Sequence, residues 1–66
     1  MKTYTEKTEE RMNLFYESLS EKDRRHYAAI EADKLGHGGI AYISALFNCS
    51  RQTIYDGMEE FKKKTF

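Results

Sequence analysis

Apolar residues recur at intervals of three and four along most of this chain, which is the spacing of one face of an α-helix. The first stretch with this pattern runs from about Thr5 to Ser18, with glutamates in its early turns that suit the positive end of a helix dipole. Its predicted buried face comprises Met12, Phe15, Tyr16 and Leu19. The apolar face indicates that this helix docks on the rest of the domain, and a mobile arm is the alternative.

A second helix is predicted from Glu21 to about Leu35. Ser20 is its expected N-cap, with Asp23 three residues later in the place that Glu takes in a capping box. Gly36 is expected to end the helix in the left-handed conformation. The predicted buried face comprises Tyr27, Ala28, Ala32 and Leu35.

Two shorter helices follow, one from Gly39 or Ile40 to Phe47 and one from Arg51 to about Lys62, with Ser50 as N-cap of the latter. Their apolar residues are again spaced to bury one side each. These residues are Ile40, Ile43, Leu46 and Phe47 in the third helix and Ile54, Met58 and Phe61 in the fourth. The pattern as a whole predicts a small all-α domain of four helices.

The connection between the third and fourth helices predicts a helix-turn-helix. About three residues join them, and such a short link favours a steep crossing over a simple hairpin. Asn48 tolerates the positive φ that a sharp turn needs, and Ser44 is small enough to let two helices cross closely. Two features depart from the usual pattern: Asn48 stands where Gly is common, and Gly57 lies in mid-helix, where Gly costs about 1 kcal/mol relative to Ala. A backbone approaching closely at Gly57 would explain it.

Composition narrows the classes of protein. The chain has 66 residues, enough for one domain, with eleven Lys and Arg against eleven Asp and Glu. Its longest apolar run, Tyr27 to Ile30, is far short of a membrane span, and the charged N-terminal stretch has no secretory pattern. The single cysteine, Cys49, allows no internal disulfide and is expected to be a small packed residue. We therefore expect a protein of the reducing cytoplasm.

The sequence offers no enzyme chemistry. It contains no recognisable nucleophile–base pair, zinc set or phosphate loop, and the glycines of residues 36–39 follow a predicted helix, not a strand. We expect neither a catalytic function nor a cofactor or metal.

Residues 19–61 also carry a more specific pattern. It consists of Leu19-Ser20-Glu21-Lys22, Arg24-Arg25, Ala29 to Ala32, Leu35 to Ile40 (LGHGGI), Ser50 to Gly57 (SRQTIYDG) and Glu60-Phe61. In these motifs the chain resembles the N-terminal region of transposases of the ISAzo13 type, whose catalytic half is a Rhodopirellula-type DDE domain. Gly57 fits the pattern of that family, whereas Phe61 stands where the family tends to have Leu. Residues 1–18 carry no such resemblance.

The resemblance implies recognition of double-stranded DNA, specifically transposon terminal repeats, in a nucleoid-associated setting. It implies no catalysis here, because the acidic metal-binding triad of such enzymes lies in a later domain. We accordingly expect a domain excised from a longer protein, or a remnant that has lost its catalytic half. Its parts would be an N-terminal helix or arm (1–18), a core (19–61) and a basic tail (62–66).

If the fourth helix enters a major groove, its outward residues near the N-terminus reach base edges. The predicted base contacts are Arg51, Gln52, Tyr55 and Asp56. Gln52 suits adenine and Arg51 suits guanine or a phosphate. Asp56 and the nearby Glu59 repel phosphates and can accept from cytosine, which is a rarer contact. An ordinary solvated helix face is the alternative for all of them.

Basic and hydroxyl side chains around this helix are the predicted phosphate contacts: Arg24, Arg25, Ser50, Thr53, Lys62, Lys63 and Lys64. Some of them have another possible role, since the lysines suit the negative end of the helix dipole and Arg24 can pair with Glu31. Glu31 falls near a buried face and needs a partner, for which the amides of Gly38 and Gly39 are the other candidates.

Residues 51–64 hold four bases and three acids, a net charge of +1. Affinity from phosphate contacts should therefore be weak, and the domain would depend on further domains or on a homodimer. The competing function is a small helical module for protein–protein interaction or dimerisation. Salt dependence separates the two, because only phosphate contacts give a steep loss of affinity with salt.

Overall fold

The computed structural model describes residues 3–64, which form four α-helices and no strand. The helices are α1 (Glu6–Ser18), α2 (Glu21–Leu35), α3 (Gly39–Phe47) and α4 (Arg51–Lys63). The predicted all-α, four-helix architecture is confirmed, with helix boundaries within about a residue of the expected ones. Residues 1–2 of the predicted arm and 65–66 of the predicted basic tail lie outside the described residues.

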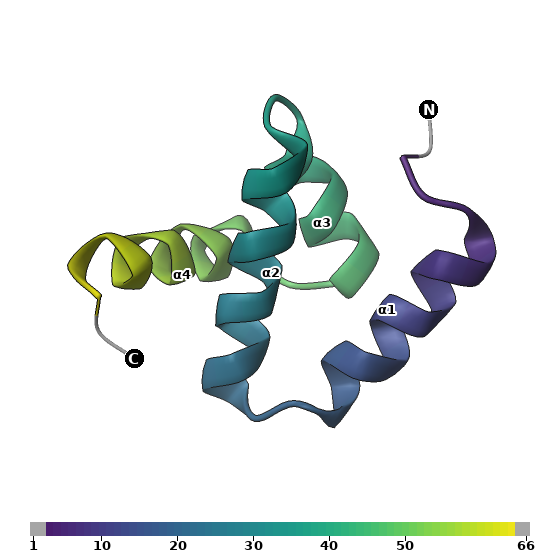
Figure 1. The fold of residues 1–66 in the computed structure, drawn as a ribbon, viewed down its shortest axis with the longest axis horizontal. Helices are drawn as coiled ribbons and strands as arrows, with labels where there is room; N and C mark the ends of the chain where they lie inside the picture. The colour runs from purple at the N-terminus through teal and green to yellow at the C-terminus, as the bar shows by residue number, and fades with distance from the viewer. Residues whose placement is uncertain (1–2, 65–66) are drawn as a thin grey trace.

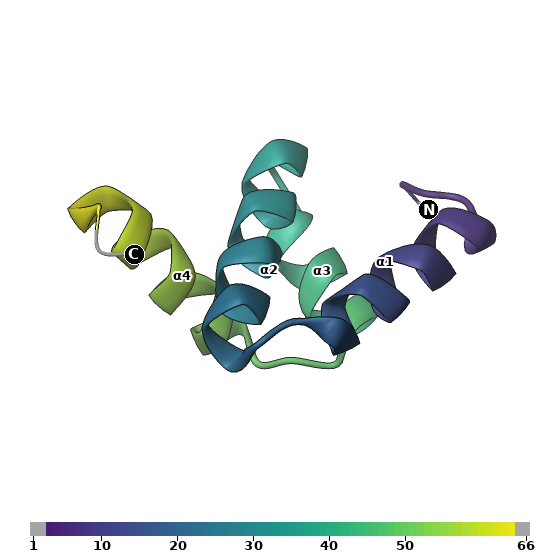
Figure 2. The ribbon, with the colours of Figure 1, turned by 60° about the horizontal axis from the view of Figure 1, so that its bottom comes forward.

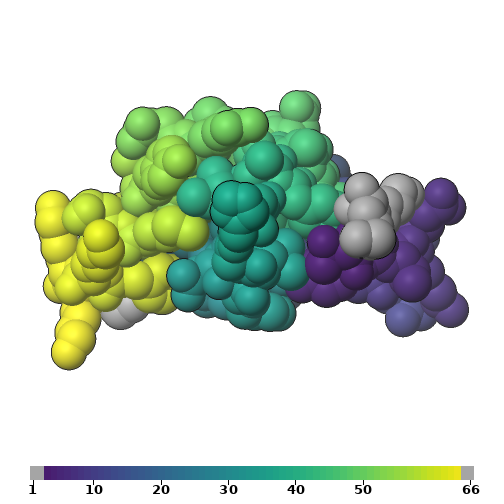
Figure 3. All heavy atoms as spheres, turned by 90° about the horizontal axis from the view of Figure 1, so that it is seen from above, coloured from purple at the N-terminus to yellow at the C-terminus, as the bar shows by residue number. Residues whose placement is uncertain are grey.

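Helix α2 is the centre of the arrangement (Figure 1). Helix α4 lies crosswise to it on one side, α3 packs along it, and α1 lies on the side away from α4 (Figure 2). Seen from above, the end of α4 and the helix α1 occupy opposite ends of the molecule (Figure 3), whose extents are 33 × 27 × 17 Å. The two outer helices therefore reach α2 and α3 from opposite sides.

Side-chain caps begin three of the helices. The hydroxyls of Thr5, Ser20 and Ser50 each accept a hydrogen bond from the backbone N–H three residues later, at 3.2, 3.2 and 3.1 Å. Each bond satisfies a donor that the helix itself leaves unpaired. Gly36 follows α2 with a φ of 70°. The predicted caps at Ser20 and Ser50 are confirmed. Gly36 ends α2 with a positive φ, as predicted, but its ψ of −132° lies outside the left-handed helical conformation that the sequence predicts.

The core lies where α2, α3 and α4 meet and is closed on one side by α1. Its buried apolar residues are Met12, Ala28, Ala32, Ile43, Phe47 and Ile54. The alanines of α2 leave room for the larger side chains of α3 and α4. Gly39 and Gly57 extend this close packing, because a Cβ at Gly57 would lie 2.5 Å from the carbonyl oxygen of Arg25. The close approach expected at Gly57 is confirmed.

Helix α1 is docked, as its apolar face predicts. The Tyr16 ring stacks on Phe47 with 4.3 Å between ring centroids, and Met12 is buried. Phe15 departs from the prediction, since its side chain is 52% exposed. The reason is that α1 covers only the edge of the core, so Phe15 meets little besides the edge of the Tyr27 ring, at 5.1 Å.

Candidate nucleic-acid interface

The turn between α3 and α4 is built by three residues with separate roles. Asn48 adopts the left-handed conformation, with φ 53° and ψ 45°, as its position predicts. The Cys49 N–H then donates to the Ser44 carbonyl at 3.1 Å, and Ser50 caps α4. The Ser50 and Thr53 hydroxyls lie 2.9 Å apart and share a hydrogen bond. The direction in which α4 leaves the turn is thus set by backbone conformation and capping together.

Beyond this turn, one face of α4 is buried and the other is open. Ile54 and Gly57 face α2 and are buried. The four predicted base-contact residues, Arg51, Gln52, Tyr55 and Asp56, are all exposed. Because they stand at spacings of one, three and four, they share a single outward face at the start of the helix.

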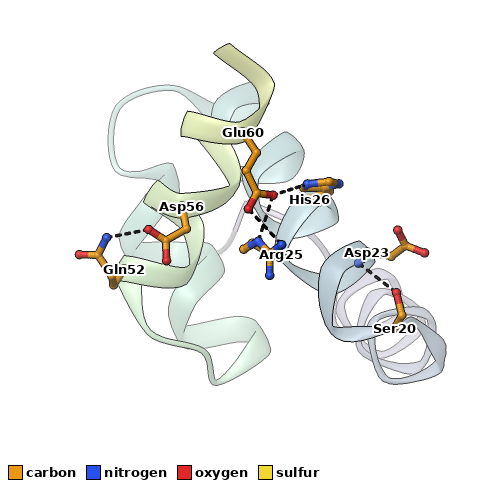
Figure 4. A network of polar contacts seen from close by, with 7 residues as sticks. All are labelled: Ser20, Asp23, Arg25, His26, Gln52, Asp56 and Glu60. Atoms are coloured by element: carbon orange, nitrogen blue, oxygen red, sulfur yellow. Dashed lines mark hydrogen bonds and ion pairs between the residues drawn. The ribbon is translucent and has the colours of Figure 1, made fainter. Parts of the chain in front are cut away.

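Two members of this face are bonded to each other. The Gln52 Nε2 donates to the Asp56 carboxylate at 2.9 Å, one helical turn away (Figure 4). Arg51 and Tyr55 lie beside this pair, and Tyr55 is 50% exposed. The face thus presents a guanidinium, a phenol and a pre-formed amide–carboxylate pair.

A hollow of about 280 Å³ adjoins the start of α4. It brings together four of the predicted phosphate-contact residues, which are Arg24, Arg25, Ser50 and Thr53. Glu21 and Asp56 also line it, so both signs of charge face the same space. The sequence separations of these residues give no sign of this juxtaposition, which arises because the start of α2 lies beside the start of α4.

Both arginines of the hollow also hold the fold together. The Arg24 guanidinium donates to the carbonyl oxygens of Tyr16 at 3.0 Å and Glu17 at 2.7 Å. It also lies 5.5 Å from the centre of the Tyr16 ring. Arg24 therefore supplies donors to two carbonyls in the last turn of α1, where the helix leaves acceptors without intrahelical partners. The pairing of Arg24 with Glu31 considered above is wrong.

Arg25 is part of a three-residue cluster that joins α2 to α4. The Glu60 carboxylate accepts from Arg25 Nε at 3.1 Å and lies 3.0 Å from Arg25 Nη2. The Nε2 of buried His26 lies 2.5 Å from the same carboxylate (Figure 4). Hydrogen bonds from Arg25 and then from His26 hold the pKa of Glu60 below its ordinary value. The sequence gives no sign of a role for His26 or Glu60, because the two residues are 34 positions apart.

Lys62, Lys63 and Lys64 are exposed at the end of α4, where the left-handed Lys64 terminates the helix. Because α4 has 13 residues, Lys63 lies about 18 Å along the helix from Arg51 at its start. Lys63 nevertheless lines a second hollow, of about 420 Å³, together with Arg25 and with the acidic residues Asp56, Glu59 and Glu60. Arg25 thus lies between the start of α4 and Lys63, since it lines both hollows.

Glu31 is buried, as its position predicts, but its partners are not the expected ones. The Tyr4 hydroxyl donates to it at 3.1 Å and the Lys34 ammonium lies 3.3 Å away. The Tyr4 N–H in turn donates to the Tyr42 hydroxyl at 3.3 Å, and that hydroxyl donates to Glu9. The prediction of the Gly38 and Gly39 amides as partners is wrong. Its failure has a physical reason: the segment before α1 folds back over α2 and α3 and brings Tyr4 to Glu31.

Comparison of this chain with known protein families, with curated proteins and with solved structures finds no match. The resemblance to transposases therefore depends on the residue motifs alone. Within residues 3–64, no helix has the length and apolar character to cross a membrane. Over the same residues, no cluster of three His, Cys, Asp or Glu side chains is placed to hold a metal ion.

Proposed function

We propose that the chain is a DNA-binding helix-turn-helix module in which α4 is the recognition helix. The observation that carries the proposal is the open face at the start of α4, with Arg51, Gln52 and Tyr55 presented outward beyond a tight turn. A recognition helix uses its N-terminal residues to contact base edges in the major groove. Arg and Gln are side chains that pair with guanine and adenine there.

The hollow beside α4 supports the same function. A guanidinium keeps donors after it has made one or two bonds, since it has five N–H groups. Arg24 and Arg25 can therefore retain their structural bonds and still contact a phosphate of a DNA strand that runs past the start of α4. The Ser50 and Thr53 hydroxyls lie on the same rim. Contacts of this kind fix the register of a protein on the duplex.

The resemblance to ISAzo13-type transposases narrows the proposal to the N-terminal recognition domain of a transposase, with transposon terminal repeats as its DNA. The low net charge of residues 51–64, +1, predicts weak binding by one copy. In this account the module supplies sequence preference, and further domains or a second copy supply affinity. The module itself would carry out no catalysis and would act at the nucleoid in the cytoplasm.

Fluorescence anisotropy of labelled duplexes tests the proposal. Candidate terminal repeats and a scrambled duplex would be titrated with the domain at several salt concentrations. We expect affinity that falls with salt, a preference for one repeat, and loss of that preference in R51A and Q52A. The matched control is R11A, which removes an exposed arginine from α1, far from α4. Absence of binding at low salt by a folded domain would contradict the proposal.

A second candidate function is self-association through an apolar groove between α2 and α4. The groove has a volume of about 450 Å³, and its apolar lining includes Ile30, Met58 and Phe61. Its rim carries Asp33 beside Lys34 and Lys62. In a two-fold contact the acidic residue of one copy would face a lysine of the other, which favours a second copy as occupant. Sedimentation of the wild type and of I30E would show whether dimers form and depend on this groove.

A further inference from the structure

The pair formed by Gln52 and Asp56 has a chemical asymmetry that bears on what α4 can read. The Gln52 amide donates one N–H to Asp56 at 2.9 Å, and both side chains are exposed (Figure 4). A primary amide has two N–H donors and one carbonyl acceptor. One N–H and the carbonyl oxygen therefore stay available on the outward face of the helix.

This remaining donor and acceptor match adenine. In the major groove adenine presents N7 as acceptor and its N6 amino group as donor, which a glutamine amide engages together. Guanine presents two acceptors there, so it can use the N–H of Gln52 but leaves the carbonyl oxygen without a donor. Because Asp56 holds one N–H of the Gln52 amide, adenine pairs with both of the remaining groups and guanine pairs with only one of them.

We infer that Asp56 is a positioning residue that holds Gln52 for recognition of adenine in double-stranded DNA; this inference rests on the proposed function. A free glutamine side chain has several rotatable bonds, and ordering them at an interface reduces affinity. The bond to Asp56 orders the amide before DNA arrives. The sequence position of Asp56, on the same face one turn later, places its carboxylate where it can do this without entering the core.

The charge of Asp56 has a second consequence. A carboxylate beside DNA repels phosphates whatever the base sequence, so it weakens specific and non-specific binding alike. The positioning effect acts only where adenine is present. Asp56 therefore raises the ratio of specific to non-specific binding while it lowers affinity overall. The acidic residue on the recognition face, which looks unfavourable for DNA binding, then has a role in discrimination.

The test uses selection of binding sites from a pool of randomised duplexes, followed by affinity measurements on single-base variants. The wild type is compared with Q52A, D56A and D56N. The base pair read by Gln52 is defined as the one whose preference disappears in Q52A. D56A and D56N both remove the charge, but only Asn at this position keeps a carbonyl oxygen that can accept from Gln52. Circular dichroism melting confirms that each variant is folded.

We expect the wild type to prefer adenine at that base pair by roughly 5- to 150-fold, the range of one good bidentate contact. D56N should keep most of this preference, and D56A should lose most of it. Because both variants lack the charge, both should bind duplexes without adenine at that position more tightly than the wild type does, whereas only D56N should also bind the adenine duplex more tightly. Equal adenine preference in D56A and D56N would overturn the inference, as would a preference for another base at the Gln52 position. These outcomes leave the proposed function standing. Failure of the wild type to enrich any sequence or bind any duplex would instead overturn the proposed function, and the inference with it.

Discussion

Gly57 in α4 lies so close to Arg25 in α2 that a Cβ on the glycine would be 2.5 Å from the Arg25 carbonyl oxygen. The same Cβ would be 2.9 Å from the Ala29 side chain. Backbone cannot move aside as a flexible side chain can, so α4 approaches α2 at this distance only because the residue is glycine. The position of the candidate recognition helix on the domain thus depends on the absence of one methyl group.

The first prediction follows from this contact. G57A should lower the free energy of unfolding by roughly 1–3 kcal/mol, the usual cost of overpacking a tight contact, although Ala is the better helix former. Urea denaturation followed by circular dichroism measures the change. A45G is the matched control. It makes the reverse exchange, from Ala to Gly, at an exposed position of α3. A stabilised G57A would mean that the two helices are not in close contact.

The turn before α4 gives a second prediction. Asn48 has a φ of 53°, a conformation that costs an ordinary L-residue about 1–2 kcal/mol and costs glycine little. N48A should therefore be destabilised by about 1 kcal/mol, whereas N48G should be as stable as the wild type or slightly more so. Equilibrium unfolding of the two variants checks this order. Greater stability of N48A than of N48G would contradict the left-handed conformation of residue 48.

Most of the fold could be predicted from the sequence because its signals are local. The helix caps at Ser20 and Ser50, the left-handed turn at Asn48 and the spacing of apolar residues each depend on neighbours within about four positions. The outward face of α4 follows from the same spacing once Ile54 is assigned to the core. These features did not require knowledge of how the helices pack.

The remainder depends on contacts between distant residues, which spacing does not report. Glu60 meets Arg25 and His26 across 35 and 34 positions, and Tyr4 meets Glu31 across 27. The same is true of the hollow that gathers Arg24 and Arg25 beside Ser50. The spacing of apolar residues shows which face of a helix is buried, but not how much of that face its neighbours cover. For this reason the sequence places Phe15 in the core although the structure leaves it exposed.

A third prediction concerns acid. Hydrogen bonds from Arg25 and His26 lower the pKa of Glu60 in the folded state from its ordinary value of 4.5. A carboxyl group of this kind stabilises the fold above its unfolded-state pKa, and this contribution is lost as the pH falls through the lower folded-state value. E60Q should thus be less stable than the wild type at neutral pH and should lose less stability on acidification to about pH 3.

Urea unfolding at a series of pH values measures this difference, and E59Q is the matched control. Glu59 is the neighbouring carboxylate on α4 and is exposed. Parallel loss of stability in E60Q and the wild type would show that the cluster does not couple α2 to α4.

A fourth prediction concerns alkali and the docking of α1. Burial, followed by the hydrogen bond to Glu31, raises the pKa of Tyr4 above its ordinary value of 10.0. Burial, followed by the hydrogen bond to Glu9, does the same for the pKa of Tyr42. A tyrosine with a raised folded-state pKa stabilises the fold below its unfolded-state pKa, and this contribution is lost as the pH rises through the higher folded-state value.

We therefore expect stability to fall above about pH 10, and the fall to be smaller in Y4F and Y42F, which have no phenol to ionise at these sites. Thermal melts across the alkaline range, with tyrosinate absorbance recorded in parallel, measure both events. Y55F serves as the control, since Tyr55 lies on the exposed face of α4 away from α1. An unchanged alkaline profile in Y4F and Y42F would show that these hydroxyls do not secure α1.

The most direct test of DNA recognition by α4 is a nuclear magnetic resonance titration of the isotope-labelled domain with a mixed-sequence duplex at low salt. If α4 recognises DNA, the amide shift changes concentrate at residues 50–56 and at Arg24 and Arg25, and they shrink as salt is added. Changes that instead centre on Ile30, Met58 and Phe61, or a spectrum that the duplex leaves unaltered, would contradict DNA recognition by α4.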